Sequence, residues 1–86
     1  MIHENHIKEK VHRFISDNTY TDPANIQYET LIFKEGYFDS MGFITLITFL
    51  EDEFKVKTED RDFIDENFES IKAITNYVTQ KLAVKT

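Results

Sequence analysis

One serine, Ser40, lies where its hydroxyl could carry a chemical group. Residues 36–42 read GYFDSMG and place Ser40 at the expected first turn of a helix, directly after Asp39. No local base activates this hydroxyl, because the histidines lie only at positions 3, 6 and 12. Ser40 could also act only as a helix N-cap, a position at which serine and aspartate are both preferred. An Asp-Ser-apolar triplet arises by chance about once per thousand residues, so its surroundings must decide between these readings.

The helix that begins at Asp39 or Ser40 is expected to run to about Phe54. At about 100° per residue, one third of its circumference collects apolar side chains and predicts an inward face. This face comprises Phe43, Leu46, Ile47, Leu50 and Phe54, with Phe49 at its border. A different arc, on the side of Ser40, holds Met41, Ile44, Thr48 and Glu51.

Apolar stripes predict two further long helices. The first spans about residues 2–17 and is lined by Ile7, Val11, Phe14 and Ile15. The last begins at a cap formed by Asn67 or Ser70 and carries Ile71, Ile74, Val78 and Leu82. Residues 60–64 indicate a short third helix, and no alternating strand pattern is present. We therefore expect residues 1–86 to form one all-α domain, a four-helix bundle with three long helices and one short one.

A long connection, residues 18–38, separates the first two helices. It contains the only proline, Pro23, together with Gly36, and its apolar run 31–33 is expected to tuck under the loop. A connection of this length in a compact domain is more often functional or well packed than idle. The stripes predict one core, made of Val11, Phe14, Leu46, Leu50, Phe54, Ile74 and Val78.

Composition bounds the class of function. The chain has 86 residues, 41% of them hydrophobic, which suffices for one modest core but leaves no room for a deep enzyme cleft. Its formal charge of -6 argues against nucleic acid or an anionic membrane as the main partner and favours basic proteins. Residues 35–69 hold eleven acids against three bases, a net of -8 by that count, so the acidic field surrounds Ser40.

Several kinds of site are not expected. No cysteine is present, so disulfides and thiol nucleophiles are excluded. His3 and His6 lack further metal ligands, and Asp60 with Asp62 lack the glycine of a calcium loop, so we expect no metal. No nucleophile–base pair or carboxylate pair can be assigned, so we expect no catalytic residue and no enzyme activity. Residues 1–13 lack the apolar run of a signal peptide and no stretch could span a bilayer, which predicts a cytoplasmic monomer.

Three segments together resemble the acyl carrier protein family. They are residues 38–41 (FDSM) at the head of the second helix, residues 49–54 (FLEDEF) at its end, and residues 67–71 (NFESI) at the start of the last helix. Each occupies the family's relative position, and the resemblance covers nearly the whole chain. It implies that Ser40 carries a 4'-phosphopantetheine arm, derived from coenzyme A, whose terminal thiol holds an acyl or aminoacyl group as a thioester.

The resemblance also implies a set of partners. A phosphopantetheinyl transferase, working with magnesium, would attach the arm, and Asp39 would help that enzyme to recognise the site. An acyl- or aminoacyl-loading ligase and downstream transferases would then act on the cargo. Met41 and Ile44 are two apolar residues beside the attachment point, which suggests a docking patch, although the long loop could instead cover them. Thr48, Glu51 and Asp52 continue this partner-binding surface, unless the acids are only solvated and Glu51 pairs with Lys55.

Departures from the family's usual pattern indicate a specialised pathway. Carriers of primary fatty acid synthesis have acidic residues in the first turns after the serine, where this chain has Gly42, Phe43 and Thr45. They also commonly have an Ile-Pro pair where this chain has residues 56–58, Val-Lys-Thr. We expect a free-standing specialised carrier. Two alternatives stay open: an aminoacyl carrier that serves an adenylating ligase, and an unmodified helical interaction module in which Ser40 only caps a helix.

Overall fold

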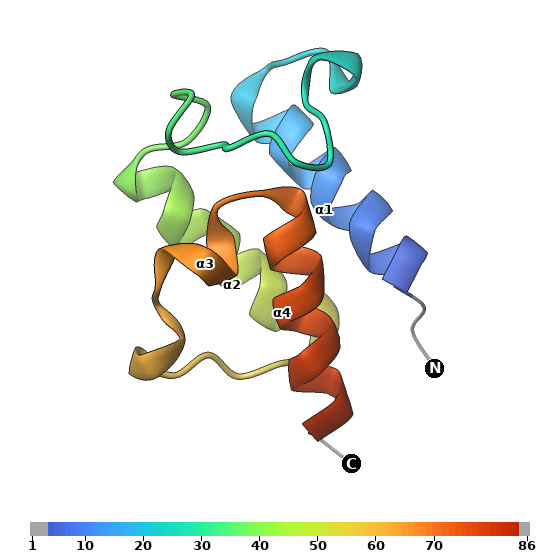
Figure 1. Ribbon diagram of the computed structural model, residues 1–86, viewed down its shortest axis with the longest axis vertical. Helices are drawn as coiled ribbons and strands as arrows, with labels where there is room; N and C mark the ends of the chain where they lie inside the picture. Colours follow the sequence, from blue (N-terminus) through green and yellow to red (C-terminus); the bar gives the residue numbers. More distant parts are fainter. Residues whose placement is uncertain (1–3, 85–86) are drawn as a thin grey trace.

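The computed structural model describes residues 4–84, which form helices and turns without a strand. The elements follow one another as α1 (Glu4–Thr19), η1 (Pro23–Asn25), α2 (Ser40–Phe54), η2 (Asp60–Asp62), α3 (Asp65–Phe68) and α4 (Ile71–Val84), where η marks a 3₁₀ turn. Figure 1 shows the connection from α1 to α2 crossing over one end of the bundle. The predicted all-α bundle of three long helices and one short one is confirmed over this range.

Helix α1 packs its apolar stripe against α4 and ends later than predicted. Its last turn contains polar side chains that bond back to helix carbonyls: Ser16 Oγ donates to the His12 carbonyl at 2.9 Å, and Thr19 Oγ1 to the Ile15 carbonyl at 2.7 Å. The helix ends at Tyr20, whose φ of 54° lies in the left-handed region. Polar residues assigned to the loop therefore extend the helix to Thr19. The predicted start, at residue 2, lies outside the described residues.

The predicted core is confirmed, with one member at its edge. Val11, Leu46, Leu50, Phe54, Ile74 and Val78 are all buried. Phe14 is only half-buried and stacks on the Phe49 ring, with centroids 4.2 Å apart. Sequence periodicity missed the core residues that come from the loops and from α3, namely Ile26, Ile32, Phe38, Val56 and Phe68. These side chains show that the connections belong to the core.

The short third helix exists, but its predicted position at residues 60–64 is wrong. A 3₁₀ turn at Asp60–Asp62 and a one-turn helix at Asp65–Phe68 replace it. Ile64 between them is extended, with φ -122° and ψ 151°. Asn67 lies inside α3 and donates its Nδ2–H to the Asp62 carbonyl at 2.8 Å, so it is not the cap of α4. Ser70 is that cap, because its Oγ accepts from the Ala73 amide at 3.1 Å.

Candidate functional site

Ser40 is the first residue of α2, and the residue before it caps the helix. Asp39 has extended backbone angles, and its Oδ1 accepts a hydrogen bond from the Gly42 amide at 2.9 Å. The alternative that Ser40 serves as the N-cap is therefore wrong. The Ser40 side chain is exposed, and within residues 4–84 no hydrogen-bond partner of its hydroxyl is present. The hydroxyl has no part in holding this turn together.

The turn before Ser40 is fixed by backbone bonds to a buried residue. The carbonyl of Ile32, a fully buried residue, accepts from the amides of Tyr37 at 2.8 Å and Phe38 at 3.1 Å. Gly36 makes this reversal possible, because its φ of 86° is costly for a residue with a side chain. The Ile32 amide in turn donates to the Glu69 carbonyl at 3.0 Å, next to α3. The start of α2 is thus tied to both the loop and α3.

Gly42 lets the buried ring of Phe38 lie directly on the first turn of α2. A Cβ atom at position 42 would stand 3.0 Å from Cδ1 of Phe38, closer than ordinary van der Waals contact. The ring is further surrounded by the rings of Phe14 and Phe33, with centroids 6.4 and 5.8 Å away. A glycine two residues after Ser40 is therefore explained by packing, which the sequence alone did not indicate.

The first turn of α2 favours an anion beside Ser40. Amides at a helix start lack intrahelical acceptors, and the helix dipole adds a partial positive charge there. Asp39 satisfies the Gly42 amide through its side chain and the Phe43 amide through its carbonyl, at 2.9 Å each. The amides of Ser40 and Met41 precede these bonds. A phosphate group on the Ser40 oxygen would meet a favourable environment.

An open apolar groove of about 840 Å³ lies beside Ser40. Aromatic rings in edge-to-face contact form much of its surface: the Phe43 centroid lies 5.8 Å from Phe33, 5.8 Å from Phe63 and 5.3 Å from Phe68. The groove is lined by Leu31, Phe33, Lys34, Asp39, Ser40, Phe43, Ile44, Phe63, Ile64, Asp65, Phe68 and Glu69. Its two sides come from residues 31–34 and residues 63–69, which are distant in sequence.

The sequence predicted only part of this groove. Ser40, Asp39 and Ile44 were identified as site residues, but the wall formed by Phe63, Ile64 and Phe68 was not. The one available signal was the apolar pair 63–64 between two acidic stretches, which had been assigned to a helix. The structure leaves Phe63 43% and Ile64 47% exposed, values that a buried helical face would not give.

Met41 and Ile44 are exposed on the outer arc of α2. Their exposed fractions are 70% and 59%, so the long loop does not cover them. Thr48 follows one turn later, also exposed, with its Oγ1 donating to the Ile44 carbonyl at 3.1 Å. Ile44 also lines the groove, and it therefore connects the outer arc with the site around Ser40.

The acidic end of α2 is partly engaged within the molecule. Glu51 Oε2 accepts from the Thr58 hydroxyl at 2.7 Å and from the Thr58 amide at 3.0 Å, and these bonds hold the pKa of Glu51 below its ordinary value. The alternative pairing of Glu51 with Lys55 is not observed between these described residues; Lys55 ends α2 in a left-handed conformation. Asp52 is exposed. The partner-binding role of both acids stays a prediction.

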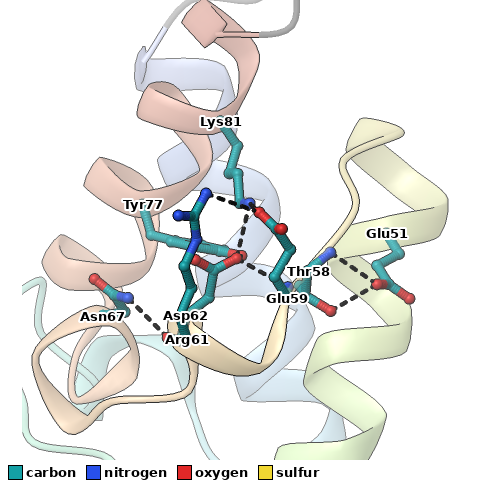
Figure 2. Close-up of polar contacts among 8 residues, drawn as sticks. All are labelled: Glu51, Thr58, Glu59, Arg61, Asp62, Asn67, Tyr77 and Lys81. Atoms are coloured by element: carbon teal, nitrogen blue, oxygen red, sulfur yellow. Dashed lines mark hydrogen bonds and ion pairs between the residues drawn. The ribbon is translucent and has the colours of Figure 1, made fainter.

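A polar network links the loop after α2 to α4, as Figure 2 shows. Asp62 Oδ2 accepts from the Tyr77 hydroxyl at 2.8 Å and from the Glu59 amide at 2.9 Å, and it lies 2.7 Å from Lys81 Nζ. Burial raises the pKa of Asp62, but the bonds from Lys81 and Tyr77 outweigh it and leave the pKa below its ordinary value. Burial, with the bond to Asp62, raises the pKa of Tyr77.

Residues 4–84 lack two further kinds of feature, a membrane-spanning helix and a metal-binding cluster. This part of the chain contains no helix with the length and apolar character needed to cross a membrane. It also contains no group of three or more His, Cys, Asp or Glu side chains arranged to hold a metal ion. Asp60 and Asp62, considered above as calcium ligands, lie in η2, where Asp62 binds Tyr77 and Lys81.

Comparison with known families gives one match. The family model described as "Phosphopantetheine attachment site" matches residues 9–78 of the chain, which include α2, α3, the groove and most of α1 and α4. Members of this family carry covalently attached 4'-phosphopantetheine and are generally carriers without catalytic activity of their own. The match supports the resemblance derived from the three sequence segments.

Proposed function

Because the chain belongs to the phosphopantetheine attachment family, we propose that Ser40 is its attachment residue and that the chain acts as an acyl carrier. The bound arm supplies a terminal thiol that holds the cargo as a thioester. One observation carries the choice of Ser40. Its exposed hydroxyl has no partner in the described chain, because Asp39 already caps α2.

The residues around Ser40 fit the group that it would carry. Phosphodiester oxygens on this side chain would lie at the start of α2, beside the amides that lack helical acceptors. The other serines fit poorly, because Ser16 is 2% exposed and Ser70 is 6% exposed. Ser16 and Ser70 also use their hydroxyls within the fold, Ser16 toward the His12 carbonyl and Ser70 as the cap of α4. Modification at either position would disrupt packing.

The groove beside Ser40 is the proposed binding site for the arm and an apolar cargo. It opens at the attachment residue and is walled by aromatic and aliphatic side chains, which favour acyl groups over polar ones. Its lining also includes the carboxylates of Asp39, Asp65 and Glu69 together with the ammonium group of Lys34, and this excess of negative charge favours a cationic aminoacyl group as the second candidate cargo. The rate of thioester hydrolysis distinguishes the acyl cargo from the aminoacyl cargo. The cargo that the groove binds should hydrolyse more slowly on the protein than on free pantetheine.

A specialised pathway is supported by what replaces the usual acids after Ser40. Gly42 accommodates Phe38, and Phe43 forms a wall of the groove. Thr45 is exposed, with its hydroxyl donating to the Met41 carbonyl at 3.0 Å. The first turns of α2 therefore present an apolar rather than a strongly acidic surface. We propose that Met41, Ile44 and Thr48 contact the transferase and the loading ligase, with Asp39, Glu51 and Asp52 adding charge.

Loading of the protein tests the attachment residue. The chain is incubated with coenzyme A, magnesium and a transferase of broad specificity, and its intact mass is measured before and after. We expect the mass of one arm to be added and to map to Ser40, and Ser40→Ala to abolish the addition. Ser16→Ala serves as the matched control and should load normally.

Two outcomes would contradict the proposal. The first is wild-type protein that stays unmodified with several transferases while a control carrier is loaded. The second is added mass that maps to Ser16 or Ser70. The first outcome would favour the unmodified interaction module, for which the exposed side chains of Met41 and Ile44 would then be the binding surface.

A further inference from the structure

One wall of the groove is not held by burial of its own side chains. Phe63 and Ile64 line the groove, yet they are 43% and 47% exposed. They lie between η2 and α3, outside any regular helix, and Ile64 is extended. Apolar side chains exposed to this degree gain only part of the stabilisation that full burial gives, and the one ring contact of this wall with α2 is that of Phe63 with Phe43 at 5.8 Å. Polar contacts of the neighbouring residues provide a second means of fixing this wall.

Asp62, directly before this wall, is bound on both its side chain and its main chain. Its carboxylate reaches two residues of α4, Tyr77 at 2.8 Å and Lys81 at 2.7 Å. Its carbonyl accepts from the Asn67 side chain of α3 at 2.8 Å and from the Ile64 amide at 2.9 Å. Figure 2 shows the side chains of Tyr77, Lys81 and Asn67 converging on Asp62. Hydrogen bonds to ionised groups are the stronger kind, so this residue is well placed to fix the wall.

The preceding part of the same segment is anchored separately. We call residues 58–64 the strap, since they cross from the end of α2 to the start of α3. At one end, Thr58 is held by Glu51 of α2 through two hydrogen bonds. At the other end, Asp62 is held by α4, and Lys81 also reaches Glu59 at 3.3 Å. The strap is therefore suspended between two helices by polar side chains.

We propose that Asp62 is a positioning residue that holds the strap, and with it the Phe63–Ile64 wall, over the groove beside Ser40, so that cargo there is shielded from water. The first half of the proposal, that Asp62 holds the wall, stands on the structure alone. The second half, that the wall shields cargo, rests on the proposed function. When Asp62 loses its bonds to Tyr77 and Lys81, the strap separates from α4, the wall moves away and the groove opens. The core helices stay packed, because their contacts lie elsewhere.

Amide hydrogen exchange on the unmodified protein tests the first half. In Asp62→Ala, we expect exchange at the Ile64 and Asn67 amides to rise about tenfold, while core amides of α1 change little. Asp60→Ala is the matched control, because Asp60 lies in the same 3₁₀ turn with an exposed side chain. If Asp62→Ala proves too unstable, Tyr77→Phe replaces it, with Tyr28→Phe as control. Exchange that does not differ between variant and control would overturn the proposal.

Hydrolysis of loaded cargo tests the second half. Acetyl and octanoyl arms are transferred from their coenzyme A thioesters to wild type, Asp62→Ala and Asp60→Ala, and loading is confirmed by intact mass. Water attack on the thioester then releases the free acid and the arm thiol, and the rate is followed by mass. In wild type and Asp60→Ala, octanoyl should hydrolyse more slowly than acetyl. In Asp62→Ala this difference should disappear, with the acetyl rate unchanged.

The outcomes separate the two proposals. A merely structural role for Asp62 would accelerate both cargoes alike and would overturn the positioning role. An octanoyl-to-acetyl ratio that is the same in all three proteins would also overturn it, while leaving Ser40 as a loaded carrier residue. Failure of every protein to load would instead overturn the proposed function, and the shielding of cargo with it.

Discussion

The two walls of the groove beside Ser40 are held by different physical means. The wall at residues 31–34 is backed by the buried side chains of Ile32 and Phe38 and by main-chain hydrogen bonds of Ile32, none of which involves an ionised group. The wall at residues 63–64 is half exposed and depends on the charged neighbour Asp62. If the proposed role of Asp62 is correct, the groove has one side backed by the buried core and one side whose position depends on a few ionised groups.

The largest difference is expected between the loss of Ile32, which lies buried behind the first wall, and the loss of Ile64, which lines the second. Ile32→Ala should lower the free energy of unfolding by about 2–5 kcal/mol, because a fully buried side chain leaves a cavity. Ile64→Ala should lower it by less than about 0.5 kcal/mol, since nearly half of that side chain is already exposed. Urea denaturation of both variants measures this difference. Equal losses would remove the distinction between the walls.

A smaller loss is expected for Gly42→Ala. The new Cβ would stand 3.0 Å from the Phe38 ring, which its aromatic neighbours hold in place. We expect the overpacking cost of about 1–3 kcal/mol to exceed the gain of about 1 kcal/mol from replacing glycine in a helix. Thermal melting should therefore occur at a lower temperature. A higher melting temperature would show that the Phe38 ring moves aside more easily than its packing indicates.

Acid pH should selectively weaken the bonds that hold the Phe63–Ile64 wall. The pKa of Asp62 is lowered in the folded protein, so its contribution to stability is present above the unfolded pKa and is lost as the pH falls through the folded pKa. The stability difference between wild type and Asp62→Asn should thus be larger at neutral pH than at an acid pH below the ordinary pKa of an aspartate. Urea denaturation at both pH values measures it, with Asp60→Asn as control. A difference that persists in acid would contradict the charged role of Asp62.

The smallest effect on stability is expected on the outer arc of α2. Ile44→Asp should change the free energy of unfolding by less than about 0.5 kcal/mol, because the side chain is 59% exposed. Its loading by a transferase should nevertheless be slower than that of wild type, whereas Asn76→Asp on the exposed face of α4 should load normally. Unfolding of Ile44→Asp would place this residue in the core. Loading at the wild-type rate would place the docking surface elsewhere.

The sequence predicted the parts of this fold that repeat with the helical period. The stripes of α1, α2 and α4 gave the main core, and the residue pattern around Ser40 placed this serine at the start of α2, while its role as the attachment residue stays a prediction. The period could not reveal Ile32 or Phe38, because loop residues have no period, nor Phe68, because the one-turn helix α3 is too short to show one. Asp39 and Ser40 are both good caps, so only backbone angles could show that Asp39 caps α2.

The groove could not be predicted for a different reason. Its walls come from segments about thirty residues apart, and their meeting depends on the path of the connections rather than on local preference. The acidic residues around position 60 indicated only a solvated surface. Asp62 gained its role from Tyr77 and Lys81, which lie one turn apart on α4 and face the strap.

The attachment of an arm at Ser40 is tested most directly by counting thiols. The chain contains no cysteine, so the untreated protein has no titratable thiol. After reaction with coenzyme A and a transferase, followed by removal of free coenzyme A, wild type should contain one thiol per chain and Ser40→Ala none. A thiol gained by Ser40→Ala, or none gained by wild type under conditions that load a control carrier, would contradict the account.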